Sequence, residues 1–254
     1  MRIDTSFDFR DGASGRDPDT HSPTLRRYHK LLWNKPLPSG RPFLSDAKPG
    51  AYLYHCSDLG EFFLSSDTII NTFTRWKRLR HIVELFPEEE NEHFRRVGST
   101  IGARIVFPAN RIDGKPTING ARGWNSKVRD RFDLTLECIR RHYLGQGSPL
   151  GDPLCNPLGD PLCNPLGDPL SSYRDFFALF ESFRGYVDFF LLHDLVNEDC
   201  SAVNFFMPFD DFSTPALPMD RAAYENYRRC SIEFVEARNR RIDRFYNLPA
   251  EHVT

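Results

Sequence analysis

A proline-rich octet that is repeated three times limits most strongly how this chain can fold. The copies span residues 148–155, 156–163 and 164–171, and the rest of the chain shows no repeat. Proline lacks a backbone N–H, so neither a helix nor a central strand can pass through these residues. Three octets are also too few to build a solenoid core. We therefore expect a loop here, with the folded parts of the chain on either side of it.

The sequence around the repeat indicates an expansion inside a surface loop. Removing residues 155–170 leaves GQGSPLGDPLSSYRDFF, which reads as a short link between two helices. Loops tolerate insertions because the entropy of loop closure grows slowly with length. We predict a single domain over residues 1–254, with the octapeptide expansion at 148–171 on its surface. The alternative is a proline-rich segment that docks into a partner, although the repeat lacks the basic anchor of such ligands.

Hydrophobic periodicity predicts an α+β fold, with a small mixed β-sheet from the N-terminal half packed against a mainly helical C-terminal half. Ser22 and Asp220 are expected to cap the first and last long helices. The predicted helices span residues 23–35, 76–86, 126–144, 172–184, 186–196 and 220–246. The predicted strands span residues 3–9, 51–55, 61–64, 101–107 and 203–209.

Composition restricts the class of protein. The net charge is −2, so no broad basic field favours non-specific binding of nucleic acid. The chain has no apolar run of membrane-spanning length, and its first residues, MRIDTSFDFR, lack the apolar core of a signal peptide. We expect a cytoplasmic protein without a membrane partner. Two of the six cysteines are copies of one repeat position and the others lack CxxC spacing, which favours reduced thiols over disulfides or zinc.

The segment TINGARGWNSKVRDRFDLTLECIRR, residues 117–141, is the strongest candidate for a site. A glycine-containing polar loop leads into the predicted helix at Ser126, whose free N–H groups could cradle an anion. Asp130 and Asp133 follow on one flank of that helix, where they could hold a metal or act as a base. The alternative is a solvated helix face with ordinary ion pairs. The predicted ligand-binding residues are Asn119, Arg122, Ser126 and Lys127.

Three further segments carry weaker signals. Asp17, Asp19 and His21 alternate in a loop before a helix, where two carboxylates and an imidazole could hold a metal or act in catalysis. The alternative is that they serve as turn and cap residues. The adjacent His193 and Asp194 could form a general base, or could simply satisfy each other at a helix end. The last helix carries six arginines that could face an acidic partner or RNA, or pair with interspersed acids: Arg228, Arg229, Arg238, Arg240, Arg241 and Arg244.

Three stretches carry a resemblance to a known family. They are SPTLRRYHKLLWNKPLPSG at residues 22–40, DRFDLTLECIRRHY at 130–143 and FRGYVDFFLLHDLV at 183–196. The chain resembles a bacterial family of about this length that has no assigned activity, over nearly its whole length except the octapeptide repeat. The resemblance implies a stand-alone domain in a bacterial cytoplasm. It implies no catalytic residue or substrate.

Two hypotheses for function follow. The first is a phosphate- or nucleotide-handling enzyme that takes a phosphate-bearing small molecule at Arg122, with Asp130 and Asp133 as metal ligands or base. The second is a non-enzymatic protein that binds an acidic partner or RNA through the last helix; nucleic acid is the less favoured ligand. The sequence specifies neither a cofactor nor an oligomeric state. Convergence of Arg122, Asp130, Asp133 and the 17–21 loop on one concave pocket would favour the first hypothesis.

Overall fold

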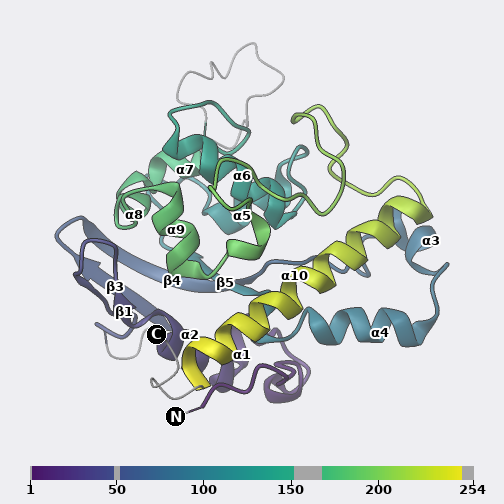
Figure 1. Ribbon diagram of the computed structural model, residues 1–254, viewed down its shortest axis with the longest axis horizontal. Helices are drawn as coiled ribbons and strands as arrows, with labels where there is room; N and C mark the ends of the chain where they lie inside the picture. Colours follow the sequence, from purple (N-terminus) through teal and green to yellow (C-terminus); the bar gives the residue numbers. More distant parts are fainter. Residues whose placement is uncertain (1, 49–51, 152–167, 248–254) are drawn as a thin grey trace.

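The computed structural model describes residues 2–48, 52–151 and 168–247, and it has an α+β fold (Figure 1). Two small sheets come from the N-terminal half. β1 (Lys35–Pro36) pairs with β2 (Pro42–Phe43), and a three-stranded sheet has the order β3 (Leu53–Ser57), β4 (Gly60–Thr68) and β5 (Arg104–Pro108). All three strand pairings are antiparallel, so the predicted mixed sheet is corrected to an antiparallel one.

The helices fall into a group before β5 and a larger group after it. The first group is α1 (Pro18–His21), α2 (Pro23–Trp33), α3 (Arg80–Val83) and α4 (Glu88–Val97). The second is α5 (Ile118–Trp124), α6 (Phe132–Tyr143), α7 (Pro169–Ser172), α8 (Arg174–Ala178), α9 (Phe183–Phe190) and α10 (Arg221–Asn247). Figure 1 shows α5 to α9 grouped on one side of the three-stranded sheet, while α10 runs past α3 and α4. Short 3-10 turns lie at Asp11–Ala13, Lys77–Leu79, Ile101–Ala103 and His193–Leu195.

Buried aromatic side chains from both halves meet in one hydrophobic cluster. Trp33 from α2 stacks against Phe189 and contacts Phe190 from α9, at ring-centroid distances of 6.0 and 5.1 Å. Phe43 of β2 and Phe180, just after α8, both contact Phe189 as well. Each fully buried aromatic side chain contributes about 2 kcal/mol by removal of its apolar area from water. The cluster therefore ties the two sheets to the C-terminal helices.

Local capping signals identify the starts of two helices, and a cap that the sequence interpretation missed sets the start of a third. The Ser22 hydroxyl accepts from the Leu25 N–H at the start of α2, as predicted. Asp220 caps α10 in the same way, with its carboxylate accepting from the Ala223 N–H. α7 begins at Pro169, three residues before the predicted start, because Asp168 accepts from the Ser171 N–H. A polar side chain next to the first turn satisfies an otherwise free N–H, and sequence alone shows it.

Several predicted elements are wrong because side chains from elsewhere take the backbone partners. Residues 3–9 are not a strand: the Asn247 amide bonds both the N–H and the carbonyl of Ile3, in place of a neighbouring strand. β5 starts at Arg104 rather than at residue 101, because Asn239 and Arg238 bind the backbone of Gly102. The predicted strand 203–209 is reduced to one bridge between Val196 and Val203.

The helical predictions also need correction at their ends. The helix predicted to start at Ser126 begins at Phe132, and a separate α5 precedes it. The 76–86 prediction is reduced to a 3-10 turn followed by the short α3, and α4 was not predicted. α9 runs through Gly185 rather than breaking there. This position needs glycine because a Cβ would lie 2.1 Å from the Phe180 carbonyl oxygen. Among the described residues, no helix is long and apolar enough to cross a bilayer.

The two described ends of the octapeptide segment lie against each other, whereas residues 152–167 fall outside the described residues. The Leu170 N–H donates to the Leu150 carbonyl at 3.0 Å, and both side chains are buried. A Cβ added at Gly151 would lie 2.9 Å from the Leu170 Cβ, so this close approach needs glycine. The single-domain organisation with an expansion at 148–171 stays a prediction, and this geometry gives it a test.

Deleting residues 155–170 should leave the melting temperature nearly unchanged. The deletion joins Leu154 to Ser171 and retains the sequence SPLGDPLSS. Leu154 then follows Leu150 by four residues, which is the separation of an ordinary i to i+4 backbone hydrogen bond. Differential scanning calorimetry measures the change, with deletion of residues 155–162 as an intermediate control. Asp168, Pro169 and Leu170 are among the removed residues and belong to the fold, so a small change requires that their repeat copies at 152–154 take their places. A fall of more than roughly 5 °C would show that the copies do not replace them.

Candidate functional site

A polar pocket of about 410 Å³ lies at the end of β4 and the start of β5, and we call it the β4–β5 pocket. Its walls come from α1, the end of α4, the segment that follows β4, the first residue of β5 and the turn before α6. Charged and polar side chains dominate the lining. They are Arg10, Asp17, Asp19, Thr68, Asn71, Thr72, Thr74, Arg75, Arg95, Ser99, Arg104 and Asp130.

Asp19 in α1 is held against the sheet by two side chains. Arg104 donates from Nη1 to both carboxylate oxygens, at 3.0 and 2.8 Å, and the Ser66 hydroxyl donates to Oδ1 at 2.6 Å. The Arg104 side chain is 6% exposed, so this charge-assisted contact lies in a poorly hydrated place where it is strong. The carboxylate of Asp19 is thus occupied by protein donors.

A chain of hydrogen bonds continues from Ser66 into the core. The Trp33 indole N–H donates to Nδ1 of His29 at 3.0 Å, and Nε2 of His29 lies 2.9 Å from the Ser66 hydroxyl. Since the indole can only donate, the His29 proton must sit on Nε2, which then donates to Ser66. Burial lowers the pKa of His29 to about 3, and the nearby Arg104 and Arg238 add to the effect.

This order of donors differs from that of a Ser–His–Asp triad. In a hydrolytic triad the imidazole accepts the serine proton, and a carboxylate orients the imidazole. Here the imidazole donates to Ser66, and Ser66 donates to the carboxylate of Asp19. These hydrogen bonds therefore position the carboxylate of Asp19, and His29 does not act as a base for Ser66.

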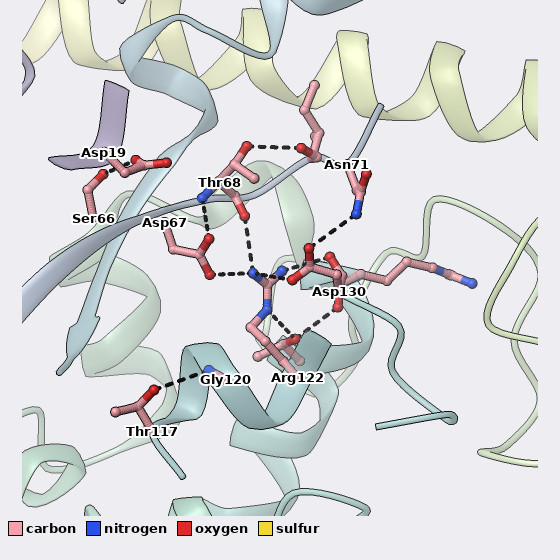
Figure 2. A network of polar contacts seen from close by, with 12 residues as sticks. Asp19, Ser66, Asp67, Thr68, Asn71, Thr117, Gly120, Arg122 and Asp130 are labelled. Carbon is pink, nitrogen blue, oxygen red and sulfur yellow. Dashed lines mark hydrogen bonds and ion pairs between the residues drawn. The ribbon is translucent and has the colours of Figure 1, made fainter. Parts of the chain in front are cut away.

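Arg122 of α5 lies at the centre of a second network, directly behind the pocket (Figure 2). Its side chain is fully buried. Nη1 is paired with the carboxylate of Asp67 and lies 3.0 Å from Oδ1 of Asp130. Nη2 donates to the Asp130 carbonyl at 2.8 Å, and Nε donates to the Thr135 hydroxyl at 3.2 Å. Arg122 therefore joins β4, α5, α6 and the turn that carries Asp130.

Asp67 lies at the end of β4 and is buried beside Arg122. Its Oδ1 accepts from the Thr68 N–H at 2.8 Å, and the Asn119 amide nitrogen, when turned towards it, lies 3.2 Å from the same oxygen. Burial raises the pKa of Asp67 to about 7; Arg122 opposes the rise, while Asp130 and Asp19 add to it. Arg122 does not cancel the effect of burial on the pKa of Asp67, because Asp67 and Asp130 share this one guanidinium.

Asp130 extends from the network into the β4–β5 pocket. Its Oδ2 accepts from the Asn71 amide at 3.1 Å, and its side chain is 27% exposed. The backbone is left-handed at Arg129 and Asp130, with φ of 49° and 65°. Non-glycine residues adopt this conformation at a cost of about 1–2 kcal/mol each. The strain is offset by Arg122, whose carbonyl accepts from the Asp130 N–H and whose side chain binds the Asp130 carbonyl.

Five of the predicted site residues meet at this place. Asp17, Asp19 and Asp130 line the β4–β5 pocket, while Arg122 and Asn119 lie in the buried network behind it. Arg122 differs from the sequence interpretation in its role, because its charge faces two carboxylates of the protein. It supports Asp130 from behind the wall of the pocket.

The other four predicted residues lie elsewhere. Asp133 is fully buried, where it pairs with Arg131 and accepts from the Phe206 N–H at 2.9 Å. His21 is exposed, and its Nδ1 faces the Asp17 carbonyl of its own helix at 3.2 Å. Ser126 and Lys127 lie in a turn before α6, so no helix starts at Ser126, and ligand binding by these two residues stays a prediction.

Many residues of the pocket and its networks were not singled out in the sequence, Asn71 and Arg75 among them. Ser66 and Asp67 lie near the end of β4, beyond the strand that the pattern limited to residues 61–64. Arg104 lies inside the predicted strand 101–107 and opens β5, and His29 lies on the apolar face of α2. Only tertiary packing brings these groups together, so their spacing in the sequence carries no motif.

The His193–Asp194 pair and the arginines of α10 mostly contact oppositely charged side chains of the protein itself. Nε2 of His193 faces Asp188 at 2.8 Å, whereas Asp194 binds Arg241, so the adjacent pair does not form a unit. Arg228 and Arg238 of α10 are buried. The other arginines of the α10 set form the ion pairs Arg229–Glu233, Arg240–Glu236 and Arg241–Asp194, apart from Arg244.

Metal binding has little support in the part of the chain that the structure describes. No group of three or more His, Cys, Asp or Glu side chains there could hold a metal ion. Asp19 is already bound by Arg104 and Ser66, and Asp17 accepts from the Asp19 N–H at 3.2 Å. The four cysteines of the described residues are free thiols, Cys56, Cys138, Cys200 and Cys230.

Replacing His29 by glutamine should remove part of the acid sensitivity of the protein. The folded state holds His29 neutral, with a pKa of about 3 against its ordinary value of 6.5, so its contribution is present above pH 6.5 and is lost as the pH falls. Between pH 7 and pH 5 this loss is about 2 kcal/mol. Urea unfolding at both pH values measures it. Equal pH dependence of wild type and His29→Gln would contradict a neutral buried histidine.

Replacing Arg122 by methionine should lower the free energy of unfolding by about 3–5 kcal/mol, because Asp67 is left buried without its cation. Adding Asp67→Asn to Arg122→Met should recover part of the loss, since the unpaired buried charge is then gone. Urea unfolding of both single variants and the double variant completes the thermodynamic cycle. A loss below about 1 kcal/mol in Arg122→Met would show that the network does not hold the fold.

Comparison with known proteins places the chain in a family. No curated protein matches it, and no solved structure matches it. The model of a family of unknown function, DUF6994, matches residues 3–157 and 159–242, which is nearly the whole chain. The β4–β5 pocket, both polar networks and nearly all of α10 lie within these matched residues. The protein belongs to DUF6994, a family of unknown function.

Proposed function

We propose that the protein binds a phosphate-bearing small molecule in the β4–β5 pocket. The observation that carries this proposal is the state of Arg104. Its Nη1 binds Asp19, its Nε is buried without a hydrogen-bond partner, and its Nη2 makes no hydrogen bond to the described residues. Nη2 is not fully buried, so it is the donor that a ligand in the pocket can reach. A ligand with several acceptor oxygens would give this charged donor the partner that it lacks.

The other arginines of the pocket support an anionic ligand to different degrees. Arg10 and Arg95 line the pocket but are paired with acidic side chains, including Glu92, which both of them contact. Arg75 is exposed at the pocket and forms no ion pair with any described residue. Arg75 and Arg104 are therefore the two guanidinium groups with donors to offer.

The chemistry of guanidinium selects the class of ligand. Its planar set of N–H donors matches the oxygens of phosphate in a bidentate way, which a lysine cannot do. A volume of about 410 Å³ lies within the range of small-molecule sites. The hydroxyls of Thr72, Thr74 and Ser99 also line the pocket and can donate to further phosphate oxygens.

Replacing Arg75 by alanine should weaken binding of a phosphate ester about tenfold, the effect of losing one charge-assisted hydrogen bond. Titration calorimetry with ribose 5-phosphate and inorganic phosphate measures the dissociation constants, and ribose gives the comparison without phosphate. Arg78→Ala is the matched control, because Arg78 is exposed three residues away and lies outside the pocket lining. Equal losses in both variants, or no binding of either phosphate compound, would overturn the proposal.

A second variant separates the role of Arg104 in binding from its role in the fold. Arg104→Lys keeps a cation next to Asp19 but removes the extra donors of the guanidinium. We expect an unchanged circular dichroism spectrum and weaker phosphate binding. Unchanged binding in Arg104→Lys would show that Arg104 only anchors Asp19.

A further inference from the structure

Asp130 presents a fixed carboxylate to the β4–β5 pocket. One oxygen, Oδ2, accepts from the Asn71 amide, and the other, Oδ1, lies 3.0 Å from the Arg122 guanidinium. A carboxylate has about four acceptor positions on its two oxygens. Each oxygen therefore keeps acceptor capacity while both are held in place. Figure 2 shows the contacts of Asp130 with Asn71 and Arg122 that hold them.

The fold places this carboxylate at an energetic cost. Arg129 and Asp130 are both left-handed, and Arg122 holds the turn through its carbonyl and its side chain. Backbone strain of this kind persists where the surrounding structure enforces it, and it gathers at ligand sites. Asp113 is left-handed too, but it is exposed and lies outside the pocket lining.

The surroundings select neutral donors for Asp130. Arg75 and Arg104 line the same pocket, and Arg122 lies directly behind the carboxylate. A ligand with an ammonium or guanidinium group would meet these cations, so hydroxyl groups are the favoured donors. Two adjacent hydroxyls can donate to the two oxygens of one carboxylate, and acidic side chains hold ribose hydroxyls in dinucleotide-binding folds.

The pocket also has an apolar surface on which a sugar ring can lie. Trp76 and Ile70 line it beside the polar residues. The indole ring offers a flat apolar area to the C–H face of a sugar. Cations, a fixed carboxylate and an aromatic ring thus line one pocket.

We propose that Asp130 determines specificity by accepting hydrogen bonds from two adjacent hydroxyls, so that the ligand of the β4–β5 pocket is a sugar phosphate. This inference rests on the proposed phosphate binding and adds the part of the ligand that Asp130 recognises. The phosphate lies at Arg75 and Arg104, and the diol lies at Asp130.

Titration calorimetry on the full chain tests whether adjacent hydroxyls increase the affinity of a phosphate ester, with ligands compared in matched pairs. One pair is ribose 5-phosphate and 2-deoxyribose 5-phosphate, whose ring form lacks adjacent hydroxyls. The other is glycerol 3-phosphate and propyl phosphate. In each pair, wild type should bind the compound with adjacent hydroxyls at least about tenfold more tightly than the compound without them. Asp130→Asn should lose most of that preference, and Asp113→Asn, the left-handed control outside the pocket, should keep it.

The outcomes separate this inference from the proposal on which it rests. One outcome is that wild type binds phosphates with and without adjacent hydroxyls equally well, while Arg75→Ala binds both more weakly than wild type. That result overturns the role of Asp130 and leaves phosphate binding in place. Binding of ribose as tightly as ribose 5-phosphate overturns phosphate recognition and leaves the diol. If Asp130→Asn does not fold, Asn71→Ala replaces it, because loss of the amide frees Oδ2 and should lower the preference. An unchanged preference in Asn71→Ala then counts against a positioned carboxylate.

Discussion

The ion pairing of one buried arginine organises the region around the pocket. A guanidinium taken out of water needs close counter-charges and acceptors for its N–H groups. Arg122 finds them in Asp67 at the end of β4, the Thr135 hydroxyl in α6, and both the carboxylate and the carbonyl of Asp130. These partners come from segments far apart in the sequence, so the positions of the strand, the helices and the turn are set together. The pocket carboxylate depends on this arrangement.

The same requirement explains why Arg122 faces carboxylates of the protein itself, whereas the sequence interpretation assigned it to a ligand. Arg122 and Asp130 were singled out because a cation near carboxylates suits phosphate chemistry. The cation is instead used by the protein, while the carboxylate reaches the pocket. Solvent exposure decides whether a charged side chain binds a ligand or another side chain of the protein. A single sequence does not show which polar side chains will be buried.

Local signals predicted the parts of the fold that depend on neighbouring residues. Ser22 and Asp220 cap α2 and α10 through hydrogen bonds to the N–H of the residue three positions later. Elements that depend on distant partners were missed. Asn247 binds Ile3 across the chain, and Asp133 binds the Phe206 N–H, and both contacts replace strand pairing that periodicity predicted. The candidate site shares this limit, because Asp19, Ser66 and Arg104 meet only in the folded chain.

The buried arginines differ in how far the protein itself supplies partners for their N–H groups, and this comparison bears on the role of Arg104. Arg238 has no carboxylate partner among the described residues, yet its nitrogens are satisfied by the carbonyls of Phe190, Gly102 and Arg104, and burial lowers its pKa to about 9. Arg228 has an unpartnered Nε, but its guanidinium packs on the ring of Phe86 at 4.6 Å. Arg228 also lines a different pocket, where it forms an ion pair with Glu90 at 3.3 Å. Among the described residues that line the β4–β5 pocket, Arg104 is the arginine with an unpartnered buried Nε, and its Nη2 is left without a hydrogen bond. A bound anion gives Nη2 a partner and gives this arrangement a physical reason.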